Sequence, residues 1–157
     1  GLGHLARVAD ALRRKPTLWD NYPVNDGPRM SRFLHLRGFT GRPGAIGPHV
    51  AAHAINPALQ PYLTLIPAAT LVASYREGSA YSYMRASRDA AHALAGPELA
   101  GLLEDDLHAL QDQGIDHLGG ERERLRQRYG AVSHPMAAEV VRWLDGADTV
   151  DRWVEAN

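Results

Sequence analysis

The sequence predicts an α/β segment at the start of the chain that leads into an all-α region. Two short apolar stretches, each followed by polar residues, lie before Pro57 and are separated by a long loop. Beyond Pro57, apolar residues recur only at the spacing of helices. Extended stretches followed by a run of helices are typical of a sheet portion joined to a helical one.

The first predicted elements are a helix and a strand. Apolar residues recur at helical spacing over residues 5–12, basic residues occupy the last turn, and Pro16 ends the helix. The apolar stretch 17–19 comes next and stops at the polar pair Asp20 and Asn21. We expect this stretch to be a buried strand.

A long loop and a second strand follow. Residues 22–48 are rich in Pro, Gly and Asn, which predicts a loop with at most one short extended piece, at 33–36. Loops of this length are usually functional or disordered. The apolar stretch 50–55 ends at Asn56 and Pro57 and predicts a second strand, although its alanines also permit a helix.

The period then changes to that of a helix, and Pro67 lies inside the first one, where it would produce a kink. The predicted buried face of this helix comprises Leu59, Tyr62, Leu63, Ile66, Ala69 and Val72. A second helix is expected over 79–95, and Pro97 opens a third. The third is expected to bury Leu99, Leu102, Leu103, Leu107 and Leu110.

Shorter helices complete the prediction after a break at residues 114–120. We expect them around Leu125, over 136–144, and from an N-cap at Asp148 through Val154. The two strands and the connection between them fit the last two βα units of a parallel barrel or of a doubly wound sheet. In a barrel, functional groups lie where the strands end.

Composition excludes several function classes. The chain of 157 residues carries 17 Lys and Arg against 18 Asp and Glu, a net charge of -1, so it lacks the positive field that binds nucleic acid or an anionic membrane. It has no cysteine, which excludes disulfides, thiol catalysis and iron–sulfur clusters. We expect no membrane span, and the sequence leaves localisation open.

The segment after the first strand, residues 18–26, combines two Asp, two Asn and two aromatic residues. Carboxylates and amides bind hydroxyl groups directionally, and an aromatic ring packs on the apolar face of a sugar, so this mixture suits a carbohydrate site. The alternative is purely structural: Asn and Asp cap turns, and Pro23 fixes the loop.

The run LWDNYPVND in this segment resembles the signature of glycoside hydrolase family 84, the β-N-acetylglucosaminidases that include O-GlcNAcases and enzymes labelled hyaluronidases. Leu36 and the triplet 40–42 are similar to the family's leucine, glycine-proline and GR segment, and Ile55-Asn56-Pro57 resembles its NP motif. The resemblance implies the C-terminal portion of a bacterial (β/α)8 catalytic barrel over residues 1–75 and a helical domain over 76–157.

The family mechanism implied is retaining hydrolysis in which the substrate's own N-acetyl group attacks the anomeric carbon, assisted by two aspartates. In the family this pair lies on an earlier strand, so we expect no catalytic residue in this chain, no activity of the chain alone, and the N-terminal remainder of the barrel as its partner. The expected substrate is a glycan or glycoprotein containing N-acetylglucosamine. No metal or other cofactor is implied.

Four substrate-binding residues follow from matching positions. Asn21 matches the asparagine near the acetamido group and the catalytic acid, and Asp26 matches the aspartate that binds the sugar's distal hydroxyls. Asn56 matches the NP asparagine, and Trp19 matches the aromatic residue lining the acetamido pocket, with a barrel-core role as its alternative. The chain departs from the family at Gly27, where an aromatic residue is common, and at residues 36–38, where LGP is usual.

Two other interpretations of the whole chain stay open: a non-catalytic carbohydrate-binding or interaction module derived from this fold, and a purely structural helical domain. Among other polar clusters, the pair Asp105 and Asp106 is expected on a solvated helix face, because neighbours in a helix point in different directions. His49 and His53 have a spacing that binds zinc on a helix but lack a third ligand nearby. Residues 121–124 alternate in charge, as exposed helices do.

Overall fold

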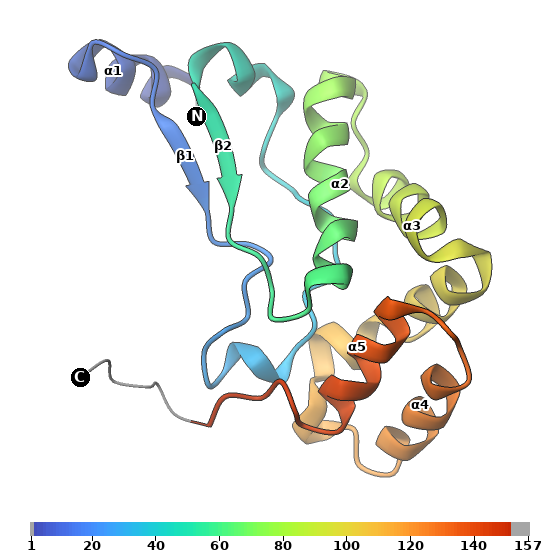
Figure 1. The fold of residues 1–157 in the computed structure, drawn as a ribbon. Helices are drawn as coiled ribbons and strands as arrows, with labels where there is room; N and C mark the ends of the chain where they lie inside the picture. The colour runs from blue at the N-terminus through green and yellow to red at the C-terminus, as the bar shows by residue number, and fades with distance from the viewer. Residues whose placement is uncertain (1, 152–157) are drawn as a thin grey trace.

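The computed structural model describes residues 2–151 of the chain. Its helices and strands are α1 (Leu2–Leu12), β1 (Thr17–Asp20), β2 (Ala52–Ile55), α2 (Pro61–Glu77), α3 (Tyr83–Asp105), α4 (Glu121–Gly130) and α5 (Pro135–Leu144). Figure 1 shows β1 and β2 side by side, α2 running along them, α3, α4 and α5 gathered beyond α2, and α1 beside the start of β1. The molecule is mostly helical with a short sheet, in the predicted order.

The sheet consists of β1 and β2, which pair in parallel with Thr17 opposite Ala52 and Asp20 opposite Ile55. The pairing extends one residue further, because the Asn56 N–H donates to the Asp20 carbonyl at 2.9 Å. Both predicted strands are confirmed. Their connection contains short 3₁₀ helices at Met30–Arg32 and Gly44–His49 but no α-helix or strand, which agrees with a long loop that holds at most one short extended piece.

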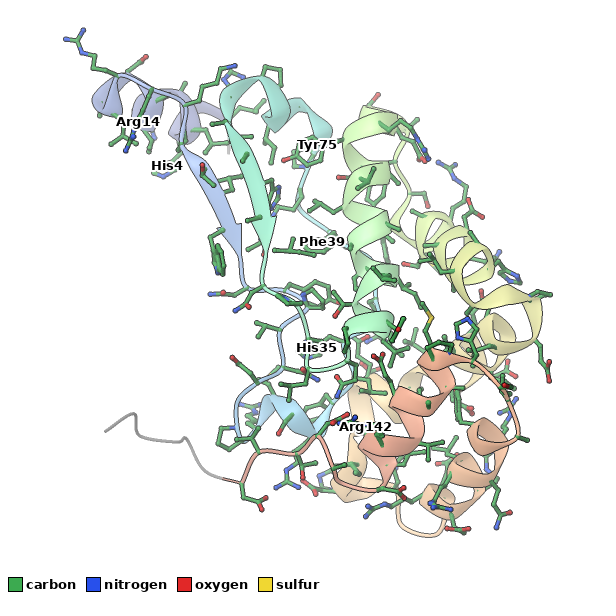
Figure 2. All side chains as sticks on the ribbon, viewed as in Figure 1. His4, Arg14, His35, Phe39, Tyr75 and Arg142 are labelled. Atoms are coloured by element: carbon green, nitrogen blue, oxygen red, sulfur yellow. The ribbon has the colours of Figure 1, made fainter. Side chains whose placement is uncertain are left out.

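The prediction that the first strand is buried is wrong for most of β1. The Trp19 side chain is 65% exposed, Thr17 is exposed, and only Asp20 is buried. Alternate strand residues point to opposite faces. Among the described residues, α2 and the connecting loop cover only the face to which Asp20 points, with Phe39 and Tyr75 lying between β2 and α2 (Figure 2).

Helix α2 follows the second strand as predicted, but its buried face differs from the predicted one. Leu63 and Ile66 are buried as expected, whereas Leu59, Tyr62 and Val72 are exposed. The buried side instead carries Thr64, Thr70 and Ser74. Each of these hydroxyls donates to a backbone carbonyl three or four residues earlier, at 2.7–2.9 Å, which removes the cost of burying it. A pattern of apolar residues alone cannot reveal such a face.

The predicted second and third helices correspond to the two halves of α3. Gly96 has φ 76° and ψ 165°, which is outside the helical region and favoured by glycine, and Pro97 starts the next turn. The first half begins at Tyr83 rather than at residue 79, because a 3₁₀ turn occupies Gly78–Ala80. Leu99, Leu103 and Leu110 are buried as predicted, and Leu102 and Leu107 pack against the core. A π-helix, His108–Gln113, follows before the expected break.

The last helices, α4 and α5, surround the most deeply buried part of the core. Leu125, Tyr129, Val140 and Trp143 have no exposed surface. They share one cluster with Leu34 of the long loop and with Leu63 and Ile66 of α2. The helices predicted around Leu125 and over 136–144 are confirmed. Residues 148–150 are not helical, and Trp153 and Val154 lie outside the described residues. The division at residue 75 stays a prediction.

The pair Asp105 and Asp106 does not form a solvated face as predicted. Asp106 is only 6% exposed, and both of its carboxylate oxygens accept from Arg128 Nη1 of α4, at 3.0 and 3.1 Å. Asp105 is exposed and contacts Arg128 Nη2 at 3.1 Å. The helix ends at this point and α4 packs against it, which brings a guanidinium over the carboxylates.

Among the described residues, no helix combines the length and apolar character that crossing a membrane requires.

Candidate functional site

The carboxyl end of β1 opens into a hollow of about 590 Å³. Two predicted site residues, Asn21 and Asp26, are exposed and both line it. The other residues of its wall are Tyr22, Val24, Gly27, Pro28, Arg29, Met30, His35 and Gln111. The hollow therefore presents a carboxylate and a carboxamide beside aromatic and apolar surface, the combination that binds sugars.

The structure brings a third predicted residue, Trp19, to the same place. Its indole N–H donates to Asn21 Oδ1 at 3.0 Å, across the buried Asp20. Asn56 lies at the end of the neighbouring strand, where its backbone N–H bonds to the Asp20 carbonyl, and its side chain is half-buried. Asn56 does not line the hollow. Two of the four predicted residues thus line the hollow, Trp19 does not line it but contacts Asn21, and Asn56 is at the adjacent strand end.

The Asn25 and Asp26 pair is divided between two tasks. Asn25 is fully buried, and its carboxamide donates to the Phe33 carbonyl and to Gln60 Oε1, both at 2.9 Å. Its Oδ1 accepts from the Leu59 N–H at 2.8 Å. These bonds tie the loop to the segment that leads into α2. Asp26, the next residue, is free to face the hollow because Asn25 anchors the backbone beside it.

A packed layer of aromatic and amide groups lies behind the hollow. The Tyr22 ring stacks on His35 with centroids 5.6 Å apart, and its hydroxyl donates to the Arg37 carbonyl at 2.6 Å. Burial raises the pKa of Tyr22 to about 12 and lowers the pKa of His35, so both are neutral near pH 7. Gln111 Oε1 accepts from the Leu36 and Arg37 N–H groups at 2.8 and 2.9 Å.

The sequence alone assigns no role to Tyr22 or Gln111, and no feature of the sequence indicates that Gln111 lies near the motif. Gln111 lies about 90 residues after the motif, and only the fold brings it to the loop. Tyr22 lies inside the motif itself, so its position was the one usable signal. Both residues also line a second hollow of about 460 Å³.

The departure from the family pattern at residues 36–38 has a structural account. Leu36 is buried, and Arg37 forms an ion pair with Asp112. A Cβ atom at Gly38 would come within 2.5 Å of Ser87 Oγ on α3 and 3.1 Å of Thr70 Cγ2 on α2, so a larger residue here would require these side chains to shift. The changed segment therefore fits the contact between the loop and the helices. Gly27, the other departure, is buried and lines the hollow.

The two histidines with metal-ligand spacing point to different surroundings. His49 ends a 3₁₀ helix, whereas His53 lies in β2 and bonds Tyr75 Oη through Nδ1 at 2.8 Å and Asp20 Oδ2 through Nε2 at 3.3 Å. Among residues 2–151, no group of three or more His, Asp or Glu side chains could hold a metal ion.

One family model matches most of the chain. Residues 2–110 match the model of the NAGidase family, described as beta-N-acetylglucosaminidase. None of the curated proteins matches the chain.

Solved structures that resemble the fold include the following two. A mutant of the Thermobaculum terrenum O-GlcNAc hydrolase is 23% identical, with a TM-score of 0.67 over 93% of this chain and 38% of that chain. CpGH84B is 16% identical, with a TM-score of 0.58 over 92% of this chain and 31% of that chain. The chain thus spans well under half the length of either structure, and at these identities the likeness concerns the fold.

Proposed function

The chain belongs to the β-N-acetylglucosaminidase family whose model it matches over residues 2–110, and we propose that it is the C-terminal part of a retaining hydrolase that removes terminal β-linked N-acetylglucosamine. One solved relative is an O-GlcNAc hydrolase, which supports including sugars attached to protein Ser or Thr among the substrates. The observation that carries the proposal is that Asn21 and Asp26 line one hollow at a strand end, with the Trp19 indole hydrogen-bonded to Asn21.

Each grouped residue has a role in this proposal. Asp26 accepts hydrogen bonds from two sugar hydroxyls, for which its exposed carboxylate on the hollow is suited. Asn21 holds the acetamido group, and Trp19, bonded to Asn21, forms the apolar wall beside it. Asn56 contributes a further hydroxyl contact from the end of β2. The two parallel strands are the last strands of a (β/α)8 barrel, and the helices after residue 75 form the helical domain, whose core is continuous with α2 and the long loop.

The chemical step uses groups outside this chain. In substrate-assisted hydrolysis the acetamido oxygen attacks the anomeric carbon while one carboxyl group polarises the acetamido N–H and another protonates the leaving oxygen. We place both carboxyl groups on an earlier strand of the barrel. The adjacent pair in this chain does not suit the role, because Asp106 is buried against Arg128 on α4 and not in the hollow.

Hydrolysis of an aryl β-N-acetylglucosaminide by the full-length protein and by residues 1–157 tests the proposal. The full-length protein should turn the substrate over and the chain alone should not, because sugar contacts without the acid and base groups lower no barrier. Robust turnover by residues 1–157 would sink the proposal. A full-length protein that binds N-acetylglucosamine without hydrolysing it would instead identify a carbohydrate-binding module.

A further inference from the structure

Asp20 occupies an unusual position between two proposed sugar-contacting residues. Its side chain is 8% exposed and points toward α2, whereas Trp19 and Asn21 on either side are exposed. Alternation along a strand places these neighbours on the opposite face. The hydrogen bond from the Trp19 indole N–H to Asn21 Oδ1 therefore joins the residues on either side of Asp20. A movement of the Asp20 backbone would change the distance between the Trp19 ring and the Asn21 carboxamide.

Two side chains hold the carboxylate of Asp20. Arg42 Nε donates to Oδ2 at 2.5 Å and Arg42 Nη2 donates to Oδ1 at 3.1 Å, a two-bond contact with both oxygens. His53 Nε2 lies 3.3 Å from Oδ2. The backbone of Asp20 is fixed as well, because its carbonyl accepts from the Asn56 N–H. One residue thus joins the end of β1, the long loop and β2.

The contacts continue into α2. His53 Nδ1 bonds Tyr75 Oη at 2.8 Å, and Figure 2 shows Tyr75 on the side of α2 that faces the sheet. The Tyr75 ring also lies 3.4 Å from the Cβ position of Gly47, on the 3₁₀ helix of the loop. Asp20 is therefore braced against a helix of the core through two intermediate side chains.

Resting on the proposed function, we propose that Asp20, held by Arg42, is a positioning residue that fixes Trp19 and Asn21 around the acetamido group and so sets the selectivity for the N-acetyl substituent. Direct binding of sugar by Asp20 does not fit its geometry. Both of its oxygens already accept from Arg42, and its side chain is buried on the face opposite to Trp19. Arg42 and Asp20 should consequently act as one unit.

The test uses the full-length protein and two aryl β-glucosaminides, one N-acetylated and one N-butyrylated. Misplacing a group by about 1 Å can cost on the order of 100-fold in rate. We therefore expect Asp20→Asn, Arg42→Gln and the double variant each to lower the ratio of kcat/KM for the acetyl over the butyryl substrate by about tenfold, because a displaced Trp19 and Asn21 distinguish the two acyl groups less well. The double variant should lose no more than either single variant, because the two side chains make one interaction. Arg42 is 40% exposed, so its replacement keeps the test available if Asp20→Asn does not fold.

Asp106→Asn provides the matched control. Asp106 is also a nearly buried aspartate paired with an arginine, but it lies between α3 and α4, away from the hollow. It should lower the melting temperature without changing the acetyl to butyryl ratio. An unchanged acetyl to butyryl ratio in both Asp20→Asn and Arg42→Gln would overturn the inference, and so would losses that multiply in the double variant. In either case, an active parent protein leaves the proposed function intact. An inactive parent protein would overturn the proposed function and the inference together.

Discussion

The loop after β1 and the helices at the end of the chain are held in place by different forces. In the loop, buried amides and ion pairs fix the backbone: Asn25, Gln111 and Asp20 together make the bonds that anchor it. In the terminal helices, Leu125 and Trp143 have no exposed surface and sit in an apolar cluster. The geometry of the site therefore depends on the directional bonds of the loop, whereas stability depends mainly on the apolar burial of the terminal helices.

Truncating the terminal core should give the largest effect and should concern stability alone. Leu125→Ala removes a fully buried side chain from α4 and should lower the free energy of unfolding by about 2–5 kcal/mol. Chemical denaturation of the full-length protein measures the loss. Under conditions well below the unfolding transition, the kcat/KM of the variant should stay within about twofold of the parent value. Changes at distant positions that share no partners usually act independently of one another. A large loss of kcat/KM in folded Leu125→Ala would break the division between the two regions.

Truncating the buried anchor of the loop should affect both properties. Asn25→Ala leaves the Phe33 carbonyl, Gln60 Oε1 and the Leu59 N–H without this partner, which should cost about 1–3 kcal/mol of stability. Asp26 loses the support of its neighbour, so kcat/KM should fall as well. Denaturation and steady-state kinetics on one preparation decide the matter. If only stability falls, the loop does not depend on Asn25 for its geometry.

Within the loop, two asparagines should separate binding from the chemical step. Asn56→Ala removes a neutral contact and should cost about 0.5–1.5 kcal/mol in kcat/KM, mostly through KM. Asn21→Ala should reduce kcat more than it raises KM, because only an interaction that strengthens in the transition state acts on the rate. Michaelis–Menten parameters for the two variants test the assignment. The reverse pattern would place Asn56, and not Asn21, beside the reacting centre.

The smallest effect should come from the ion pair between Arg37 and Asp112. The hydrogen bond from Arg37 lowers the pKa of Asp112 from 3.8 to about 2. The folded state therefore favours the ionised form, and this contribution is present above pH 3.8 and lost as the pH falls toward 2. Both side chains are partly exposed, so the effect should stay below about 1 kcal/mol. Denaturation at pH 7 and near pH 2.5 should show a smaller acid loss for Asp112→Asn than for the parent.

The sequence predicts the regions held by apolar burial better than the regions held by directional polar bonds. Apolar periodicity predicted α5 and the buried leucines of α3, because burial leaves a repeating pattern in the sequence. It failed for the face of α2 that buries Thr70, whose hydroxyl satisfies itself within the helix. It also failed for Asp106, whose burial depends on Arg128 from another helix. Partners that are distant in the chain leave no local pattern.

The candidate site shows a similar limit. Asn21 and Asp26, which line the hollow, were expected to share a site because both match positions of the family motif. Gln111 and Tyr75 reach the same region from helices far along the chain. Their contributions depend on how the loop packs on α2 and on the segment after α3. Sequence reasoning therefore predicted the exposed groups of the site and missed the side chains that support them.

The most direct measurement of the central claim is the effect of Asp26→Ala on the full-length protein, with kcat/KM and melting temperature determined together. Asp26 is exposed on the hollow. We expect the loss of its charge-assisted hydrogen bonds to the sugar to cost about 1.5–3 kcal/mol of transition-state stabilisation. The melting temperature should stay the same. A folded Asp26→Ala variant that retains the parent's kcat/KM would contradict the claim that this strand-end hollow binds the sugar.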